Sequence, residues 1–343
     1  MLDTGRSLDF SNKLLDKITA EDRILIITHD NPDPDALASA YALSYLIEMT
    51  RGIKSVIACG GVVGRRENRT LIDKIEIQIR RIEELDLNEF DLVCMVDAQP
   101  GTGNSSMAAG ETLDVVIDHH PIRNESQMPN VLCDIRPEYG ACATILFEYL
   151  QAQNIRLSTR LATAMFYAIR SETQDLGREW VAPDRHAYLE LLSLSNNRIL
   201  FDIAQAKVPR SYFSSFDTAL QSAHTYNDIL VFNLYNIDHS DTVAEIADFL
   251  LRTEGIGLVL GMGCTGDEEV LSLRTDREDV FAGRVIRRLV EGIGTAGGHG
   301  MIAGGQIKGV SDERQAQVEL EEKLVGRLLE IFEYKDVQRL PLI

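Results

Sequence analysis

The feature that most constrains the fold is the alternation of short apolar runs with longer helical patterns over the first two hundred residues. Four runs rich in β-branched residues begin at Arg23, Lys54, Asp91 and Asp114. Four segments with apolar residues at three- and four-residue spacing begin near Asp35, Asn68, Ala141 and Ser158. Strands that alternate with helices in this way form a parallel sheet covered by helices. We therefore expect an α/β domain with a doubly wound, mainly parallel sheet.

A second, smaller α/β unit is expected in the C-terminal part of the chain. The segment 206–226 is polar and is expected to act as a linker. Beyond it, the strand-like runs DILVFNLYN, IGLVLGM and EVLSLRT alternate with helical patterns, and a long helix is expected from Ser311. The sequence thus predicts one domain at 1–205 and another at 227–343.

The composition indicates a chain that folds without disulfide bonds, as expected in a reducing compartment. The 343 residues are 45% hydrophobic, which is enough for two separate cores. The five cysteines are scattered and never form a C-x-x-C pair, so neither a disulfide framework nor a zinc knuckle is indicated. The start MLDTGRSLDF lacks a basic and apolar leader, and no apolar run approaches the roughly 20 residues that a bilayer requires. We expect a cytoplasmic protein with no membrane partner.

The charge balance limits the class of partner. Asp and Glu number 53 against 34 Lys and Arg, for a formal net charge of -19. Such a field repels polyanions unless bound metal or a local basic patch offsets it, although a solvated acidic surface also accounts for it. We expect no long duplex nucleic acid as a partner, and a short oligonucleotide or small nucleotide as substrate.

Polar residues gather where the first expected strand ends. The segment from Thr28 to Asp35 reads THDNPDPD and supplies His29, Asp33 and Asp35. Each proline disfavours helix in the residue before it, so Asn31 and Asp33 are expected to be extended. Ligands bind at this edge of an open α/β sheet. The alternative is that Asp35 only caps the following helix.

Two later strands are expected to deliver further ligands to the same edge. One runs into Asp97, and the next runs into Asp118, His119 and His120. Several carboxylates in a partly buried cleft repel one another unless cations compensate. Mixed carboxylate and imidazole ligands suit manganese or iron and tolerate magnesium, and the thiolates of a structural zinc site are missing. The pattern therefore predicts a divalent-metal site.

HDNPDPDA, the Asp97 strand end and DHH, in this order, resemble the motifs of the DHH phosphoesterase superfamily, which includes RecJ-like exonucleases and oligoribonucleases. The resemblance implies a hydrolase with two divalent metal ions, manganese first and magnesium as the alternative. It implies one ion on His29, Asp33 and Asp97, with Asp97 as a bridge. The second ion would be held by Asp35, Asp97, His119 and Glu172.

The same resemblance implies roles for the neighbouring residues. His120 would hydrogen-bond the phosphate or assist protonation of the leaving oxygen, and Asp118 would orient a histidine. The family's fourth motif resembles Ala168 to Thr173, but Glu172 stands where aspartate is usual. Asp175 is therefore the alternative ligand.

A glycine-rich stretch, GTAGGHGMIAGG from Gly294, lies near the C-terminus. Glycines let backbone amides approach an anion, although a lone stretch of this kind is more often a tight turn. It resembles the GGHxxAxG motif of the DHHA1 domain, which accompanies the DHH domain in one subfamily and argues against the second domain of family II pyrophosphatases. The resemblance implies that Arg274, Gly297, Gly298 and His299 bind substrate phosphate.

The expected function is a metal-dependent phosphodiesterase or exonuclease that acts on short oligonucleotides, as in stand-alone DHH/DHHA1 oligoribonucleases that also remove phosphate from 3'-phosphoadenosine 5'-phosphate. One alternative is a soluble phosphodiesterase for cyclic dinucleotides such as cyclic-di-AMP or for their linear products. Another is a nucleotide sensor without catalysis. The sequence does not determine the oligomeric state, and a homodimer is one alternative.

Overall fold

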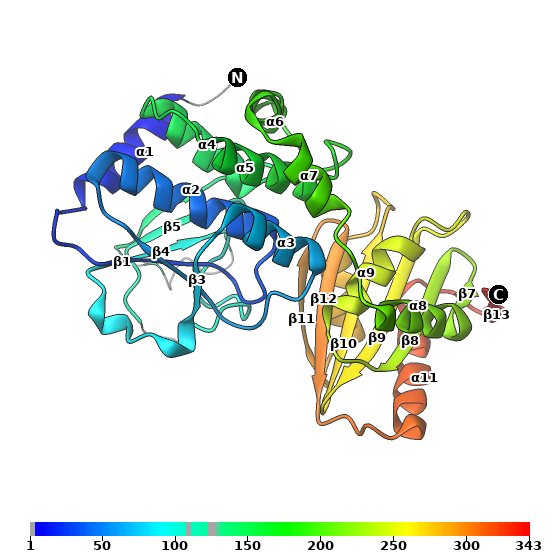
Figure 1. Cartoon of the computed structure of the whole chain (residues 1–343). Helices are drawn as coiled ribbons and strands as arrows, with labels where there is room; N and C mark the ends of the chain where they lie inside the picture. Colours follow the sequence, from blue (N-terminus) through cyan, green and yellow to red (C-terminus); the bar gives the residue numbers. More distant parts are fainter. Residues whose placement is uncertain (1–3, 108–110, 123–127, 129) are drawn as a thin grey trace. The chain divides into compact units, whose positions relative to one another are not determined.

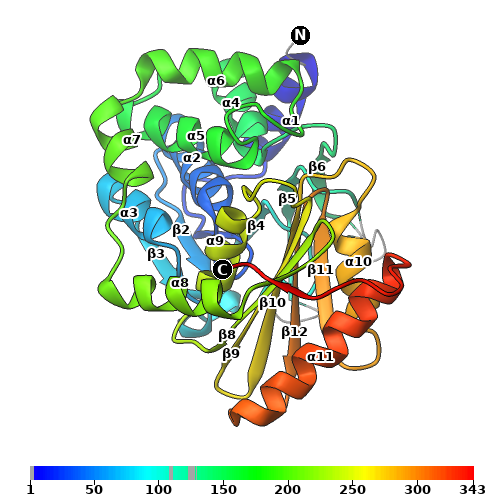
Figure 2. The same ribbon diagram turned by 90° about the vertical axis from the view of Figure 1, so that its right-hand side faces the viewer.

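The computed structural model describes residues 4–107, 111–122, 128 and 130–343. The chain divides into two compact units, Met1–Ala206 and Lys207–Ile343. Figures 1 and 2 show both units as ribbons from two directions. No helix in the described ranges is both long and apolar enough to cross a membrane.

The first unit is built on a six-stranded sheet in the order β3-β2-β1-β4-β5-β6, and every neighbouring pair is parallel. The strands are β1 (Ile24–Ile27), β2 (Val56–Cys59), β3 (Ile79–Arg81), β4 (Leu92–Val96), β5 (Val115–Asp118) and β6 (Leu132–Ile135). This order is that of a doubly wound sheet, and it reverses between β1 and β4. The predicted fold class is confirmed. The residues of β1, β4 and β5 are all buried, as in parallel strands covered on both faces.

One face of this sheet carries the larger core, over which the helices lie (Figure 1). The helices are α1 (Thr4–Asp16), α2 (Pro34–Arg51), α3 (Arg66–Ile75), α4 (Cys142–Ala152), α5 (Thr159–Glu172), α6 (Ala182–Leu194) and α7 (Asn197–Ala204). A smaller core on the other face includes Leu25, Ile27 and Met95, and Ile82 of the short 3-10 helix Ile82–Glu84 packs there. A second 3-10 helix spans Leu87–Glu89.

A buried ionic network lies between α1, β6 and α4. Arg136 is fully buried, and its guanidinium donates to Asp134 Oδ2 at 2.6 Å, Glu148 Oε2 at 2.7 Å and Ser7 Oγ at 2.9 Å. The Tyr149 hydroxyl donates to Asp134 Oδ2 at 2.6 Å. Arg136 thus pairs with two buried carboxylates, Arg6 of α1 also pairs with Asp134, and the network connects the N-terminal helix to the edge of the sheet.

The second unit is built on a seven-stranded sheet in the order β11-β12-β10-β9-β8-β7-β13, in which only β8 and β9 are parallel. Its strands are β7 (His224–Tyr226), β8 (Ile229–Asn236), β9 (Leu258–Thr265), β10 (Glu268–Thr275), β11 (Thr295–His299), β12 (Ile302–Lys308) and β13 (Leu340–Pro341). The helices are α8 (Arg210–Ser222), α9 (Asp241–Leu250), α10 (Ala282–Leu289) and α11 (Arg314–Ile331). Residues of α8 and α9 form a core on one face, and those of α10 and α11 on the other (Figure 2).

Two expectations for this unit change in detail. Residues 210–222 of the expected linker form α8, and the end of that segment forms β7. The glycine-rich stretch is not one tight turn but a hairpin of β11 and β12, in which Gly297 pairs with Gly304. A Cβ on Gly298, which has φ +150°, would lie 2.5 Å from Ala303 Cα, so glycine is needed there for the close approach of the strands.

A second polar group is buried between β10 and α11. Glu269 is 1% exposed, and its Oε2 makes no hydrogen bond within the described part of the chain. Burial and the nearby charge of Glu321 raise the pKa of Glu269 to about 7. Glu321 accepts hydrogen bonds from Asn233 and Tyr235, each at 3.2 Å. Glu269 therefore keeps its proton at neutral pH more readily than an exposed glutamate does.

We predict that Arg136→Met lowers the free energy of unfolding of the first unit by about 3 to 5 kcal/mol, because it leaves the buried Glu148 without its cation and Asp134 with only the half-exposed Arg6. Arg160→Met is the control, since Arg160 pairs with Glu76 at the surface, where an ion pair contributes only about 0 to 1 kcal/mol. Denaturant unfolding of both variants measures the difference. Equal losses would contradict a structural role for the buried network.

We also predict that the stability of the second unit falls as pH rises from about 5 to about 8. The folded state holds the Glu269 proton up to a pKa of about 7, whereas the unfolded chain releases it near 4.5, so the folded state binds more protons in this window. Glu269→Gln should remove a few kcal/mol of this pH dependence, at about 1.4 kcal/mol per pKa unit. Glu268→Gln, its partly exposed neighbour, is the control. An unchanged slope in Glu269→Gln would refute the assignment.

Candidate metal centre

The carboxyl ends of three adjacent strands bring the predicted ligands together. Strand β4 lies between β1 and β5, and the chain leaves these strands into His29, Asp97 and His119. The reversal of strand order between β1 and β4 lies at the same place, where open α/β sheets bind ligands. The sheet topology alone therefore carries residues 29, 97 and 119 to one edge.

Asp97 lies at the centre of this group. Its side chain is 2% exposed, and its backbone has φ +55°, a left-handed conformation that is uncommon outside glycine. Oδ2 lies 3.7 Å from His29 Nε2, and Oδ1 lies 3.4 Å from His119 Nε2. Oδ1 makes no hydrogen bond to any residue that the structure describes. Each oxygen of one buried carboxylate thus faces a different histidine.

The two histidines present the same ring nitrogen to the carboxylates. The Nδ1 atom of His29 lies 2.8 Å from the Asp30 carbonyl, and that of His119 lies 3.1 Å from the Tyr139 carbonyl. A carbonyl only accepts hydrogen bonds, so Nδ1 carries the proton in both rings. Each neutral ring would then turn the lone pair of Nε2 toward a carboxylate. That arrangement is repulsive without a cation and typical of metal-binding histidines.

The pKa values of the histidines reflect the negative charge of the cluster. Burial alone would lower the pKa of His29, but hydrogen bonding and charge from Asp33 and Asp97 outweigh it and raise that pKa well above its usual range. The same balance, with Asp97 as the main partner, raises the pKa of His119. Without metal, protons on the histidines therefore take the place that divalent ions would fill.

Asp33 and Asp35 have different partners. Asp33 is extended, and its Oδ1 caps α2 by accepting from the amides of Asp35 at 2.9 Å and Ala36 at 3.0 Å. Its Oδ2 lies 3.8 Å from His29 Nε2. The alternative that Asp35 caps this helix is therefore wrong. Asp35 is 1% exposed and accepts instead from the amides of Cys142 and Ala143 at the start of α4.

Asn31 was expected to be extended, and this expectation is wrong. Asn31 has φ +54°, and its side-chain oxygen accepts from the Val62 amide at 2.8 Å. Asparagine tolerates the left-handed conformation better than most residues, and this hydrogen bond to the loop after β2 stabilises it.

Two sets of donors could each hold an ion. His29, Asp33 and Asp97 place one ligand atom each within 4.8 Å of one another, and so do Asp97, His119 and His120. Asp35 Oδ2 lies 3.8 Å from His119 Nε2. These are the oxygen and nitrogen donors that manganese and magnesium sites use, with no thiolate among them. The unpaired Asp97 Oδ1 and the repulsive Nε2 atoms fit a divalent ion.

His120 differs from the other two histidines because a carboxylate holds its ring. Its Nδ1 lies 2.8 Å from Asp118 Oδ1, and Asp118 Oδ2 accepts from Gln99 Nε2 at 2.7 Å. Burial would lower the pKa of His120, but the hydrogen bond to Asp118 outweighs it and raises that pKa. Asp118 thus orients His120, and Gln99 orients Asp118.

Glu172, not Asp175, lies in the electrostatic field of the cluster. Burial and the charge of Asp33 raise the pKa of Glu172 to about 7, and His119 opposes the rise. Asp175 is exposed and accepts from Arg170 Nε and from the Tyr188 hydroxyl, each at 2.9 Å. Glu172 is the last residue of α5, which carries it to the strand ends.

Sequence reasoning missed two supporting residues. Asp30 accepts from the Ser106 amide and hydroxyl, each at 2.8 Å, and so fastens the loop after Asp97 beside His29. Gln99 is 2% exposed and also donates to the His120 carbonyl at 3.0 Å. A buried polar residue directly after a ligand strand was the available signal for Gln99. No signal in the sequence pairs Asp30 with Ser106.

The substrate residues expected in the second unit are placed as follows. Arg274 is 6% exposed, and its guanidinium donates to Asp248 Oδ1 at 2.6 Å and to the Leu273 carbonyl at 3.0 Å. Gly297 and Gly298 lie in β11. The side chain of His299 lies outside the described residues. A role for these four residues in binding phosphate stays a prediction.

Comparisons with known proteins agree with this geometry. Residues 23–169 match the family described as DHH family, N-terminal domain. An uncharacterized protein of Methanocaldococcus jannaschii is 33% identical over 92% of this chain and 65% of its own length. A probable manganese-dependent inorganic pyrophosphatase of Lactiplantibacillus plantarum is 28% identical over 43% of this chain and 47% of its own length. The chain thus spans less than two thirds of these relatives.

Two solved structures share the fold. An exopolyphosphatase-related protein from Bacteroides fragilis aligns with a TM-score of 0.73 at 15% identity, covering 96% of this chain and 98% of that chain. RecJ from Thermus thermophilus, in complex with Mn2+, aligns with a TM-score of 0.50 at 12% identity, covering 95% of this chain and 55% of that chain. The motifs, the sheet order and the ligand cluster therefore agree with the match of residues 23–169 to the N-terminal domain of the DHH family.

Proposed function

We propose that the chain is a metal-dependent phosphodiesterase that hydrolyses short oligonucleotides at the Asp97 centre. The observation that carries the proposal is that the two oxygens of Asp97 face different histidines, so one carboxylate belongs to two sets of metal ligands. Manganese in the printed names of a relative and of a solved structure supports the choice of ion.

We assign the ligands of two ions as the DHH resemblance implies: His29, Asp33 and Asp97 would hold one ion, and Asp35, Asp97, His119 and Glu172 the other. The first set is also a group of donor atoms within 4.8 Å of one another, whereas the second such group contains Asp97, His119 and His120. Divalent ions bound there would supply Lewis-acid chemistry, since they activate water for in-line attack on phosphorus and neutralise the oxygens that gain charge. Protons on the histidines would give way to these ions on binding.

His120 and its partners complete the reaction. The ring that Asp118 holds would hydrogen-bond the scissile phosphate or give a proton to the leaving oxygen. Gln99 would keep Asp118 in place from its other side. Asp30 would keep the loop after Asp97 closed against the strand ends.

The net charge of the chain bears on the class of substrate. A long strand needs a basic track with aromatic stacking platforms, because most of its affinity comes from its phosphates. A net charge of -19 and an aromatic content of 6% favour short substrates instead. Removal of phosphate from 3'-phosphoadenosine 5'-phosphate would use the same centre.

Hydrolysis of inorganic pyrophosphate is the second candidate, and the probable pyrophosphatases among the relatives favour it. Their similarity extends over only 43% to 44% of this chain, so most of the chain is outside it. Cyclic dinucleotides are a third candidate class of substrate. The non-enzymatic alternative is a protein that binds nucleotides as a sensor and does not hydrolyse them.

We predict that chelation abolishes hydrolysis, that manganese restores it, and that Asp97→Asn lowers kcat more than about 100-fold. Loss of an outer residue at a metal site costs about 10- to 100-fold, and a shared ligand should cost more. Asparagine tolerates the φ of +55° that Asp97 adopts, so the fold is kept while the charge is lost. Activity and bound manganese are measured together.

Asp175→Asn is the matched control, because Asp175 is an exposed carboxylate three residues beyond Glu172 that pairs with Arg170. It should keep both metal content and activity. Full hydrolysis in chelator, or by Asp97→Asn, would refute the metal mechanism, and an inactive manganese-loaded protein would favour the sensor.

We predict that di- to pentanucleotides are cleaved to mononucleotides much faster than strands of about 20 nucleotides, which need a continuing basic track. Initial rates are compared at equal concentrations of substrate ends, with cyclic-di-AMP and pyrophosphate in parallel and Asp97→Asn as the control for contaminating nucleases. Equal cleavage of the long strand would contradict the length argument. Preference for pyrophosphate or for the cyclic dinucleotide would replace the proposed substrate.

A further inference from the structure

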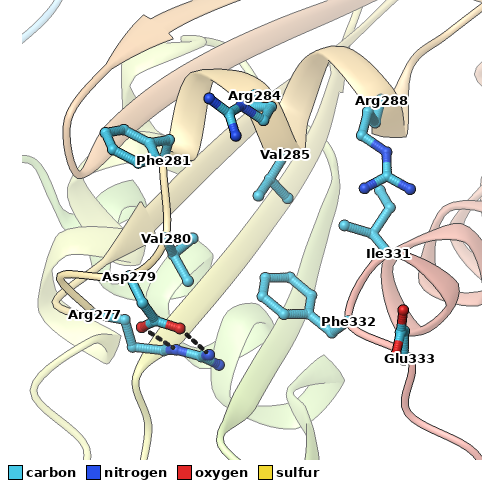
Figure 3. A pocket seen from close by; sticks show the side chains of 10 residues that line it. All are labelled: Arg277, Asp279, Val280, Phe281, Arg284, Val285, Arg288, Ile331, Phe332 and Glu333. Carbon is cyan, nitrogen blue, oxygen red and sulfur yellow. Dashed lines mark hydrogen bonds and ion pairs between the residues drawn. The ribbon is translucent and has the colours of Figure 1, made fainter.

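A pocket of about 300 Å³ lies in the second unit, between α10 and the C-terminal end of α11 (Figure 3). Val280, Val285 and Ile331 give it apolar walls, and arginines and phenylalanines complete the lining. Its volume is at the lower end of the range of about 300 to 1,000 Å³ for small-molecule sites. Nothing in the metal centre uses these residues.

The pocket is positively charged on an acidic protein. Helix α10 reads AGRVIRRL and so carries three arginines and no acid, in a chain with a net charge of -19. Arg284 and Arg288 line the pocket one helical turn apart. Among the residues that the structure describes, neither guanidinium group has a hydrogen-bond or ion-pair partner.

The acidic groups in the lining do not cancel this charge. Asp279 is bound by Arg277, whose Nη2 lies 2.9 Å from Asp279 Oδ2. Arg277 also pairs with Asp228 at 3.0 Å. Glu333 is the one remaining carboxylate among the lining residues that the structure describes. Two guanidinium groups therefore face one carboxylate, which leaves an anion site.

Aromatic rings flank these cations. Phe281 is 58% exposed, and the Arg284 guanidinium carbon lies 5.3 Å from its ring centroid. Phe332 lies under Arg277 at 5.4 Å. Figure 3 shows Phe281 beside Arg284 at one end of the pocket, and Arg288 over Ile331 at the other. A large exposed phenylalanine is a platform on which a flat ring can stack.

We propose that this pocket binds a nucleoside monophosphate, with its phosphate on Arg284 and Arg288 and its base against Phe281. The planar forks of two arginines match phosphate oxygens. The volume suits one nucleotide rather than a strand. This site goes beyond the proposed hydrolysis and does not depend on it, because a monophosphate contains no diester bond.

The test uses the full, manganese-loaded chain and adenosine 5'-monophosphate in equilibrium dialysis. Arg284→Ala and Arg288→Ala should each weaken binding about tenfold or more, the scale of a charge-assisted hydrogen bond, and Phe281→Ala about fivefold or more. Arg287→Ala is the matched control, since Arg287 is exposed on the same helix but does not line the pocket. It should bind within about twofold of the unchanged chain, as a surface substitution does.

Two further measurements locate and identify the ligand. Hydrogen exchange should slow in segments 277–289 and 328–334 when the nucleotide binds, and adenosine and inorganic phosphate should each compete far less well than the monophosphate. Protection confined to the first unit, equal binding by all three arginine variants, or equal competition by inorganic phosphate would overturn the proposal. So would tighter binding of a strand of about 20 nucleotides, since long strands bind through many phosphates.

Discussion

The structure of the first unit depends on the concentration of carboxylates around Asp97. Asp33, Asp35 and Glu172 surround Asp97, and burial and the neighbouring carboxylates raise the pKa of Asp35 and of Glu172. A buried, unpaired carboxylate oxygen and a left-handed backbone at Asp97 each cost about 1 to 3 kcal/mol. Proteins keep such unfavourable features at sites where a bound ion or a reaction requires them. The unfavourable local interactions of the first unit are thus concentrated at the site where its chemistry is proposed.

The rest of the fold supports that arrangement. The parallel sheet carries three strand ends to one edge, and the N-termini of α2 and α4 supply the amides that bind Asp33 and Asp35. Backbone carbonyls set the tautomers of His29 and His119, whereas a carboxylate holds His120. Rigid elements rather than long loops therefore position most of the ligands, as precise metal geometry requires.

Much of this could be predicted from sequence because the signals are local. Strands β1, β2, β4 and β5 are mainly apolar runs, and the proposed ligands His29, Asp97 and His119 follow within two residues of the ends of β1, β4 and β5. Strands β3 and β6 were not predicted because they are partly exposed and contain charged residues, so neither forms a continuous apolar run. Asp33, and not Asp35, caps α2, because the Asp35 carboxylate accepts hydrogen bonds from amides 107 and 108 residues away. Pairings of that kind, like those of Arg136, arise from tertiary packing and leave no local pattern.

In the second unit, too, local sequence patterns predicted strands, whereas features that arise from tertiary packing were not predicted. The strand-like runs IGLVLGM and EVLSLRT form most of β9 and β10, as their apolar patterns predicted. The arginines of α10, in contrast, have meaning only once α11 supplies the opposite wall of a pocket. Charged residues on one face of a helix are common in proteins. That Arg284 lies beside the exposed Phe281 is seen only in the folded structure.

We propose that two metal ions share Asp97, and electron paramagnetic resonance of the manganese-loaded chain measures whether they do. Two manganese ions that share one carboxylate couple their spins, so we expect two ions per chain and a coupled spectrum. Asp97→Asn should abolish the coupling. A single bound ion, or two ions with uncoupled spectra in the unchanged chain, would show that Asp97 is not shared.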